Sequence, residues 1–414
     1  MNTQSSPMIA HNDADDVVGI RFGESAFYRA GIALFLLGFA SFSLIYCVQP
    51  LLPIFVESFQ ISPASSALSL SITTFFLAFS IVLSSAFSQS LGRKGLMLCS
   101  MGCAAVLNLV CAWSPSWHAL VLMRAIEGFV LGGVPAVAMA WIAEEIHPGH
   151  LAKTMGLYIA GTAFGGMMGR VSVGIMAEYF SWRYALSILA IMSLLCCIGF
   201  YYLLPASKNF VAQKGINLQL HLHAWWTHLC NKRMLLIYSL GFLSTSVFVC
   251  LFNYLTFYLG EAPFSLSYTQ ISLIFLVYSF GILSSSMSGY MADRLGRFQV
   301  LYLGLGLIIL GILMTLIHQL WCIIIGIGLF TTGFFFVHAM ASSQVGLLAK
   351  HYKGHATSIY LLFYYVGSSI VGTVGGWFWQ AQGWTSIVWL TLSLCLCAVL
   401  VVFAAQKLSM KTYP

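Results

Sequence analysis

Long apolar segments, separated by short polar ones, follow one another along almost the whole chain. Each is close to the ~20 residues that an α-helix needs to cross the hydrocarbon core of a bilayer. The apolar runs are continuous, which excludes the alternating pattern of outer-membrane β-strands. The pattern predicts an all-α membrane protein with twelve spanning helices near residues 30–56, 66–88, 96–113, 118–142, 154–178, 184–204, 234–259, 268–291, 299–317, 320–345, 356–380 and 385–405.

The composition indicates that this chain is surrounded by lipid. Of the 414 residues, 60% are hydrophobic and only 7% are charged, whereas about 25% of the residues of a soluble domain are charged. The formal net charge is +7, but no basic run exists, so a lipid bilayer and not a nucleic acid is the expected partner. Most of the 11 cysteines lie inside apolar segments and no CxxC pair occurs; we interpret them as small apolar residues.

The positions of lysine and arginine predict the orientation. In a twelve-helix arrangement nearly all of them fall on one side, and the other side holds only Arg183. Because basic residues collect in cytoplasmic loops, we expect both termini in the cytoplasm and the chain in a bacterial-type inner membrane. The polar start of the chain predicts no cleavable signal peptide. The expected organisation is a cytoplasmic tail (1–29), a six-helix bundle (30–204), a cytoplasmic linker (205–233), a second six-helix bundle (234–405) and a second tail (406–414).

The linker contains a different pattern. Apolar side chains recur between Leu218 and Leu229, as in an amphipathic helix at a membrane surface. His221, His223 and His228 lie in the same stretch and invite a metal interpretation, but no nearby acid completes a set of ligands. An interfacial helix is therefore the prediction, and no metal site is expected.

The two predicted bundles resemble each other. Leu91-Gly92-Arg93 follows the second apolar segment, and Leu295-Gly296-Arg297 follows the eighth. Internal repeats with a binding site between them are a common plan for transporters. Glycines of the fifth segment also have counterparts in the eleventh, and helix packing is the alternative role of these residues: Gly161, Gly166 and Gly169 against Gly367, Gly372 and Gly375.

The segment Gly289-Tyr-Met-Ala-Asp293-Arg294-Leu-Gly296-Arg297 resembles a loop signature of the major facilitator superfamily. The resemblance implies a fold of two six-helix pseudo-repeats, in which this loop is part of a cytoplasmic gate that closes through charge pairs and a helix end. A loop whose positive charge only sets the topology is the alternative. In the first half the aspartate and first arginine are replaced by Gln89 and Ser90, so a charge-based gate is not expected there, although three other residues of the signature remain: Gly92, Arg93 and Lys94.

Two further segments fit the same family. Leu122-Met-Arg124-Ala-Ile-Glu127-Gly128 resembles its Arg-x-x-Gln-Gly motif, with glutamate in place of the usual glutamine. The segment Gly161-x-x-x-Gly165-Gly166-x-x-Gly169-Arg170 resembles the glycine-rich signature of antiporters, with Gly166 where that pattern has proline. This form of the glycine-rich segment resembles that of the YnfM-like, arabinose-efflux-like subgroup of the family. Two further segments resemble the same subgroup: Tyr46-x-x-Gln49-Pro50-Leu-Leu-Pro53 and Phe335-Phe-Val-His338-Ala.

Three charged residues, Arg124, Glu127 and Arg170, lie deep inside predicted spans, where a charge costs at least ~2.5–3.5 kcal/mol. Since a helix rises ~1.5 Å per residue, Glu127 lies ~13 Å and Arg170 ~12 Å from the same membrane face. We therefore expect one cluster in which the arginines keep the carboxylate charged. Its predicted role is in substrate binding and proton coupling, a structural ion pair is the alternative, and His338 is a second candidate proton carrier.

The expected cluster carries two positive charges and one negative charge, which favours anionic, zwitterionic or neutral substrates over cations. Polar and aromatic residues of several spans are candidates for the substrate cavity. Tyrosines also collect at membrane interfaces, which is the alternative for those in the set. The candidates are Tyr46, Gln49, Asn108, Asn253, Tyr254, Tyr278, Tyr364 and Tyr365.

No Walker glycine loop occurs, so ATP is not the expected energy source, and no nucleophile–base or metal constellation suggests an enzyme. The sequence therefore predicts a monomeric secondary transporter that needs no cofactor. We expect it to export small organic molecules in exchange for protons, by alternating access between the two bundles. An uptake symporter of the same fold and a transport-inactive membrane sensor are the alternatives.

Overall fold

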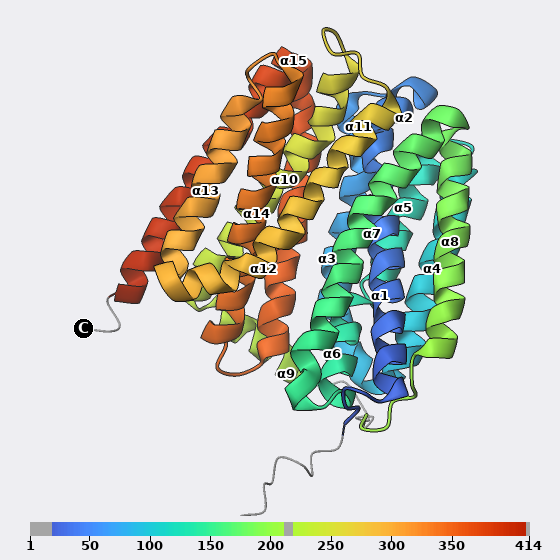
Figure 1. Ribbon diagram of the computed structural model, residues 1–414, viewed down its shortest axis with the longest axis vertical. Helices are drawn as coiled ribbons and strands as arrows, with labels where there is room; N and C mark the ends of the chain where they lie inside the picture. Colours follow the sequence, from blue (N-terminus) through green and yellow to red (C-terminus); the bar gives the residue numbers. More distant parts are fainter. Residues whose placement is uncertain (1–18, 211–217, 411–414) are drawn as a thin grey trace, which may run out of the picture.

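Helices make up almost all of the structure. The computed structural model describes residues 19–210 and 218–410, with the side chains of all of these except residues 85–91, 152 and 218. Within these residues the only β-type contact is an isolated bridge between Ile20 and Ile146. Figure 1 shows long helices side by side, with the first half of the chain (blue to green) next to the second half (yellow to red). The predicted all-α membrane architecture is confirmed.

The first half contains eight α-helices and two short 3-10 helices: α1 (Ser25–Tyr46), η1 (Gln49–Leu51), α2 (Leu52–Phe59), α3 (Pro63–Leu91), α4 (Arg93–Ala112), α5 (Trp117–Leu131), α6 (Pro135–Glu145), η2 (Pro148–His150), α7 (Leu151–Tyr179) and α8 (Trp182–Leu203). The second half follows the same plan: α9 (Leu218–Leu229), α10 (Lys232–Gly260), α11 (Tyr268–Ile274), η3 (Phe275–Val277), α12 (Tyr278–Leu295), α13 (Arg297–Met314), α14 (Leu320–Leu348) and α15 (Lys353–Met410). We call α1–α8 the first bundle and α10–α15 the second bundle.

Ten segments of the described chain are long and apolar enough to cross a membrane. Helix α7, with 29 residues, is also long enough to cross a membrane. The non-helical residues Gln382 and Gly383 divide α15 into two. With α7 added, and with α15 counted as two, the described residues contain twelve segments of membrane-spanning length.

Polar residues just before the helices explain several of their starts. Ser62, Ser116 and Ser181 precede α3, α5 and α8, and each hydroxyl accepts a hydrogen bond from a backbone N–H of the first turn. Asn231 does the same for α10. These side chains satisfy N–H groups that have no carbonyl partner inside the helix. The sequence marks these helix starts with a polar residue directly before an apolar run.

The first predicted span, residues 30–56, is interrupted in the structure. Helix α1 ends at Tyr46, and η1 and α2 continue the span after a short break. Pro50 and Pro53 have no amide hydrogen to donate, which explains why a regular helix does not continue through them. The break places Gln49 at the start of η1, where its side chain is buried.

The two bundles meet at the end of the molecule that carries α2 and α11, at the top of Figure 1. Here α7 packs against α11, and α2 packs against α10; α3 packs along α15. Gly376 of α15 lies so close to Ala64 of α3 that a Cβ atom at this position would clash with the backbone. Thr74 and Ser369 share a hydrogen bond of 2.8 Å between the same two helices.

The segment between the bundles is held at both ends. The backbone N–H groups of Lys208 and Asn209 donate to the carboxylate of Glu145, at the end of α6, at 3.0 and 2.9 Å. On the other side, α9 is joined to the start of α15, because the ring nitrogens of His221 and His355 lie 2.8 Å apart. The linker therefore contacts the first bundle before residue 211 and the second bundle after residue 217.

Helix α9 is amphipathic, and it buries two histidines while it exposes apolar side chains. His221 and His228 are buried against the start of α15, whereas His223 is exposed. Leu222 and Trp226 are 53% and 68% exposed, as expected for an apolar face turned toward lipid. Within the described residues, no group of three or more His, Cys, Asp or Glu side chains is arranged to hold a metal ion.

Candidate functional site

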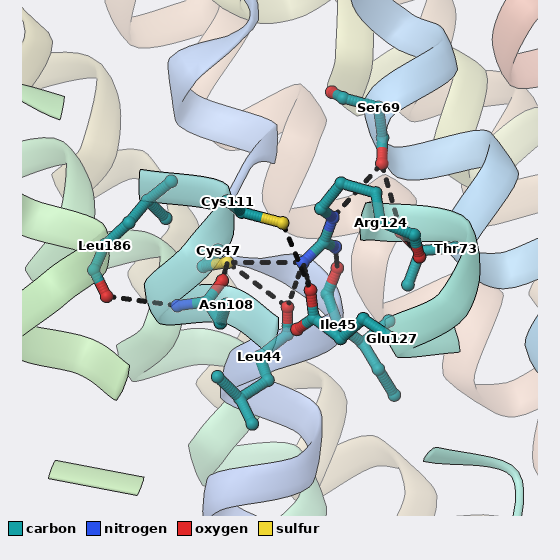
Figure 2. A network of polar contacts seen from close by, with 10 residues as sticks. All are labelled: Leu44, Ile45, Cys47, Ser69, Thr73, Asn108, Cys111, Arg124, Glu127 and Leu186. Atoms are coloured by element: carbon teal, nitrogen blue, oxygen red, sulfur yellow. Dashed lines mark hydrogen bonds and ion pairs between the residues drawn. The ribbon is translucent and has the colours of Figure 1, made fainter. Parts of the chain in front are cut away.

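Arg124 and Glu127 of α5 form an ion pair inside the first bundle (Figure 2). Arg124 Nη1 lies 2.8 Å from Glu127 Oε2, and both side chains are fully buried. Arg124 also donates to the carbonyl oxygens of Leu44 and Ile45 at 3.0 and 2.8 Å. These carbonyls lie in the last turn of α1, where no further turn supplies N–H donors. Arg124 therefore supplies hydrogen-bond donors to the unpaired carbonyl groups at the end of α1, and Glu127 balances the positive charge of Arg124.

Glu127 has one oxygen that remains without a partner. Oε2 accepts from Arg124, whereas Oε1 is buried and has no hydrogen bond with a described residue. The thiol of Cys111 is 4.0 Å from Oε2. A buried carboxylate oxygen without a donor is costly, so this atom is the part of the pair that could gain from a proton.

Asn108 lies close to this pair but does not face the second bundle (Figure 2). Its Nδ2 donates to the Leu186 carbonyl at 3.0 Å, and its Oδ1 accepts from the Cys47 thiol at 3.7 Å. It therefore joins α4 to α8 and α1. Its amide is used inside the first bundle in this structure, so a place for Asn108 in a substrate cavity stays a prediction.

Arg170 does not belong to the Arg124–Glu127 pair. The expected cluster of three charges does not form, and within the described residues Arg170 has no ion pair. Its side chain leaves α7 toward the second bundle, and its guanidinium lies 4.1 Å from the ring centre of Tyr46 of α1 and 4.6 Å from that of Tyr278 of the second bundle. Two side chains on neighbouring helices must lie at similar depths to touch, but they must also point toward each other. Arg170 leaves α7 on the face toward the second bundle, whereas the Arg124–Glu127 pair lies inside the first bundle.

Gln49 connects Arg170 to the second bundle. Arg170 Nε donates to Gln49 Oε1 at 2.6 Å, and Nη1 donates to the carbonyl of Gly166 in the preceding turn. Gln49 Nε2 in turn donates to Asn253 Oδ1 of α10 at 2.8 Å. The chain Arg170–Gln49–Asn253 therefore runs from α7 through η1 to α10.

Two buried hydrogen-bond donors lie at this chain without partners. Asn253 Nδ2 and the Tyr278 hydroxyl make no hydrogen bond with any described residue. Arg170 is itself only 2% exposed and lies over the ring of Tyr278. Buried polar groups in proteins are normally paired, so a buried cation beside an unpaired hydroxyl indicates a place where an acceptor could bind.

Aromatic side chains extend from Arg170 into the second bundle. The rings of Tyr278 and Phe335 have centres 6.3 Å apart, and Phe334 stacks on His338 at 5.9 Å. The ring of His338 lies 4.8 Å from that of Tyr364, and its Nδ1 is 3.0 Å from the Tyr360 hydroxyl. His338 therefore belongs to an aromatic surface of α12, α14 and α15 and has no acidic partner within the described residues.

Tyr254, also predicted for the cavity, is less suited to it. The Tyr254 hydroxyl donates to the Gly372 carbonyl at 2.8 Å, which joins α10 to α15 inside the second bundle. Tyr365 is buried in α15 beside Tyr364, with ring centres 5.0 Å apart, and it lies within electrostatic range of Tyr46 and Tyr158 of the first bundle. Six of the predicted cavity residues therefore lie around the boundary between the bundles: Tyr46, Gln49, Asn253, Tyr278, Tyr364 and Tyr365.

A family model of the Major Facilitator Superfamily matches residues 34–265 and 261–411. The chain belongs to this superfamily of membrane transporters. It is 41% identical to the MFS-type transporter YybF of Bacillus subtilis over 386 residues, which cover 92% of this chain and 94% of YybF. It is 39% identical to the inner membrane transport protein YnfM of Escherichia coli over 372 residues, which cover 89% of this chain and 88% of YnfM. The predicted YnfM-like subgroup is therefore confirmed.

The fold is also found in a solved superfamily structure. The structure of the nucleoside transporter NupG aligns with a TM-score of 0.75, covers 91% of this chain and 99% of NupG, and shares 15% sequence identity. At this identity the likeness concerns the fold. The superfamily arrangement of two six-helix bundles agrees with the twelve helices of this chain.

The superfamily's glycine-rich signature in α7 has a packing role at most of its positions. A Cβ atom at Gly161, Gly165 or Gly169 would clash with the backbone of α1. Gly166 is different, because it faces Arg170 and Tyr46 and accepts the Arg170 hydrogen bond with its carbonyl. The glycines thus bring α7 close to α1 and allow Arg170 to lie beside Tyr46.

The two loops of the predicted cytoplasmic gate have the same backbone turn. Gly92 and Gly296 end α3 and α12 with positive φ angles of 78° and 92°, a conformation that glycine adopts readily. In the second loop, Asp293 is exposed and forms no ion pair with any described residue. Arg294 lies over the ring of Tyr290 at 4.4 Å, and a Cβ atom at Gly289 would meet no described atom within 4 Å. Arg297 forms no ion pair with a described residue.

The first loop contains the charge pair that the sequence did not predict. Arg93 forms two hydrogen bonds with the carboxylate of Glu144, at 3.1 and 2.6 Å. Lys94 donates to the Leu204 carbonyl at 2.6 Å, and the side chain of Gln89 lies outside the described residues. The Arg93–Glu144 pair joins α4 to α6 inside one bundle, so it does not hold the two bundles together.

The partners of the charged residues were not predicted from the sequence. Glu144 is the first of two adjacent acids at the end of the fourth span, and a nearby basic loop was the available signal. Phe275 and Phe335 surround Arg170 and Tyr278. Their signal was an aromatic-rich pattern in the spans of the second half, which also fits ordinary helix packing.

Proposed function

We propose that this superfamily member is a proton-coupled exporter of small organic molecules that works by alternating access between its two bundles. The observation that carries the proposal is the chain Arg170–Gln49–Asn253 at the boundary between the bundles. It contains a buried cation without a carboxylate partner among the described residues, and it joins elements that must separate when the site opens to the other side.

The same chain favours substrates with an anionic group. An unpaired buried charge is costly, and a carboxylate or phosphate could accept from Arg170 and from the hydroxyl of Tyr278, whose ring lies beside it. Zwitterions could use the same donors through their acidic group, and neutral molecules through a carbonyl. Cations would meet like charge, and no described carboxylate lies in contact with Arg170.

Substrate binding at Arg170 would compete with the contact between the bundles. Gln49 accepts from Arg170 Nε and donates to Asn253 of α10. An anion that replaced Gln49 as the acceptor for Arg170 would free the Gln49 side chain and so weaken its hydrogen bond to α10. Binding energy spent in this way favours separation of the bundles at this end. This supplies a physical link between an occupied site and the change of access.

Glu127 is the proposed proton-coupling residue. It does not contact Arg170, so coupling would pass through α1. Arg124 holds the carbonyls of Leu44 and Ile45, and the residues that follow them include Tyr46 and Gln49, which contact Arg170. Protonation of Glu127 would remove the counter-charge of Arg124 and loosen the end of α1 that positions the substrate site.

Export, orientation and oligomeric state complete the proposal. The α7 segment from Gly161 to Arg170 resembles the signature of antiporters, which supports export in exchange for protons. The distribution of lysine and arginine favours an inner-membrane location with both termini and the linker in the cytoplasm. Each bundle contributes to the one site at their boundary, so a monomer is sufficient for transport.

A stability screen followed by flux measurement tests this function. The purified protein is heated with a panel of organic carboxylates and with their neutral amides, because a ligand that binds the folded state raises the melting temperature. We expect carboxylates to stabilise the wild type, and Arg170→Gln to lose this effect while Arg183→Gln keeps it. The best carboxylate is then followed in proteoliposomes with a pH gradient of either sign.

The direction of coupling separates the proposal from its rivals. Export in exchange for protons requires carboxylate movement against an inward proton flow. Movement of carboxylate and protons in the same direction would identify an uptake symporter instead. Stabilisation by a carboxylate without flux in either gradient would identify a membrane sensor.

A further inference from the structure

An apolar groove lies on the outer surface of the first bundle, between α4, α5 and α8. Its volume is about 900 Å³, and neither a charged residue nor an amide side chain lines it. Leu98, Gly102 and Val106 of α4 form one wall, and Ile198 of α8 lies opposite. Helices α4 and α8, and the segment that α5 forms with α6, are long and apolar enough to span the membrane. The groove therefore opens toward the lipid and not toward the boundary with the second bundle.

Two basic residues lie at one end of this groove. Arg29 Nη2 donates to the Tyr202 carbonyl at 2.8 Å, and Lys94 Nζ donates to the Leu204 carbonyl at 2.6 Å. Since these carbonyls are two residues apart at the end of α8, the two positive groups are neighbours. Lys94 also lies 5.4 Å from the ring centre of Tyr201, which lines the groove. The basic pair is thus continuous with the apolar surface.

The two cations lack a counter-charge in the described chain. Neither Arg29 nor Lys94 forms an ion pair with a described carboxylate. Each carbonyl contact uses one donor, so the guanidinium and the ammonium group keep further N–H donors. Like charges held close together repel each other, and an anion between them would remove that repulsion.

We propose that this groove binds one anionic phospholipid. Its phosphate would accept from Arg29 and Lys94, and an acyl chain would lie along Leu98, Gly102 and Val106. Tyr201 and Tyr202 are 52% and 69% exposed, and they lie between the basic pair and the apolar wall, where tyrosine is favoured at a membrane interface. The order of cation, tyrosine and apolar groove matches the order of phosphate, glycerol region and hydrocarbon in a phospholipid.

Charge complementarity selects an anionic lipid over a zwitterionic one. Phosphatidylglycerol carries one net negative charge, whereas the ammonium group of phosphatidylethanolamine would meet two cations. Each basic residue near an anionic lipid surface contributes about fivefold to binding, so the pair should favour the anionic lipid by about thirtyfold. The site is separate from Arg170, and it does not depend on the proposed transport function.

Native mass spectrometry of the purified full-length protein tests the proposal. The protein in detergent is titrated with phosphatidylglycerol and with phosphatidylethanolamine that carry identical acyl chains. We expect the wild type to prefer phosphatidylglycerol by about thirtyfold. The double variant Arg29→Gln, Lys94→Gln should lose most of this preference. The control Lys350→Gln, Lys353→Gln removes two exposed basic residues of the second half and should keep it.

A second variant tests the groove itself. A Cβ atom at Gly102 would meet only Cys197 Sγ, at an ordinary contact distance of 3.5 Å, so Gly102→Leu should fold and fill the groove without changing any charge. We expect it to weaken phosphatidylglycerol binding at least tenfold, since the volume for the chain is lost. Unchanged binding in Gly102→Leu, or an equal loss in the basic double variant and its control, would overturn the proposal.

Discussion

Gln49 and Asn253 are 204 residues apart in the chain, yet Gln49 Nε2 donates a hydrogen bond to Asn253 Oδ1 at 2.8 Å. Both side chains are buried, and they belong to different bundles. The same Gln49 accepts from Arg170 on its other side. One amide therefore joins the candidate substrate site to the contact that holds the bundles together at this end.

Replacing Gln49 should loosen this end of the molecule. A buried hydrogen bond contributes about 1 kcal/mol, so Gln49→Ala should shift the balance between closed and open forms about fivefold toward open. Amide hydrogen exchange should then become faster in α2 and α11. Gln406→Ala is the matched control, because Gln406 bonds Tyr302 within the second bundle. Equal exchange in the two variants would contradict the role of Gln49.

The two buried arginines should differ in what they do for stability. Arg124→Gln leaves Glu127 and the carbonyls of α1 without their donor, and breaking a buried pair in this way typically costs about 3–5 kcal/mol. Arg170→Gln leaves no unpaired carboxylate behind, so its unfolding temperature should equal or exceed that of the wild type. Thermal unfolding in detergent measures both. A large loss in Arg170→Gln would mean that Arg170 is mainly structural.

Glu127→Gln should separate exchange from proton-driven transport. The amide cannot give up a proton at this position, so net flux driven by a pH gradient should be abolished while substrate exchange continues. Proteoliposomes with and without an imposed gradient measure the two activities separately. Glu57→Gln is the control, since Glu57 is exposed on α2. Full gradient-driven flux in Glu127→Gln would mean that the carboxylate is structural, and His338 would then be the next candidate for the proton-coupling residue.

Asp293→Asn should damage transport without lowering stability. Asp293 is exposed and has no ion pair with a described residue in this conformation. Any ion pair that it forms therefore belongs to the state in which the predicted cytoplasmic gate is closed. We expect the initial rate to fall at least tenfold, as loss of a charge-assisted contact of about 1.5–3 kcal/mol implies. Gln89→Ala should have a much smaller effect. Similar small effects at equal expression would reject a gate based on the second loop.

Reporter fusions test the orientation. Fusions after Lys214, in the linker, and after Pro414, at the end of the chain, should both show cytoplasmic activity, because basic residues collect on the cytoplasmic side. A reporter that is active only in the cytoplasm and one that is active only in the periplasm give complementary signals. Periplasmic activity at either position would contradict the proposed topology.

The sequence predicted the helices well because their signal is local. An apolar run that begins just after Ser181 or Asn231 shows both the length of a span and the capping residue that starts it. The break after Tyr46 was less apparent, since Pro50 and Pro53 lie within an apolar stretch that still crosses the membrane. The superfamily and its YnfM-like subgroup followed from short motifs that keep their spacing along the chain.

The candidate site was predicted only in part, because depth along a helix does not determine direction around it. Arg170 and Glu127 were placed at similar depths, but α7 turns Arg170 toward Tyr278 while α5 turns Glu127 toward α1. The glycines that bring α7 against α1 fix this rotation. Their pattern was recognised in the sequence, but the helix that they contact could not be derived from it.

The attachment of the linker at both ends limits how far the bundles can move. Lys208 and Asn209 are tied to Glu145, and His221 is tied to His355. Between these anchors the chain from Phe210 to Leu218 can reach at most about 28 Å, since an extended residue advances by ~3.3–3.6 Å. The linker therefore acts as a tether of fixed maximum length, and any wider separation of the bundles at this end must first break one of the two anchors.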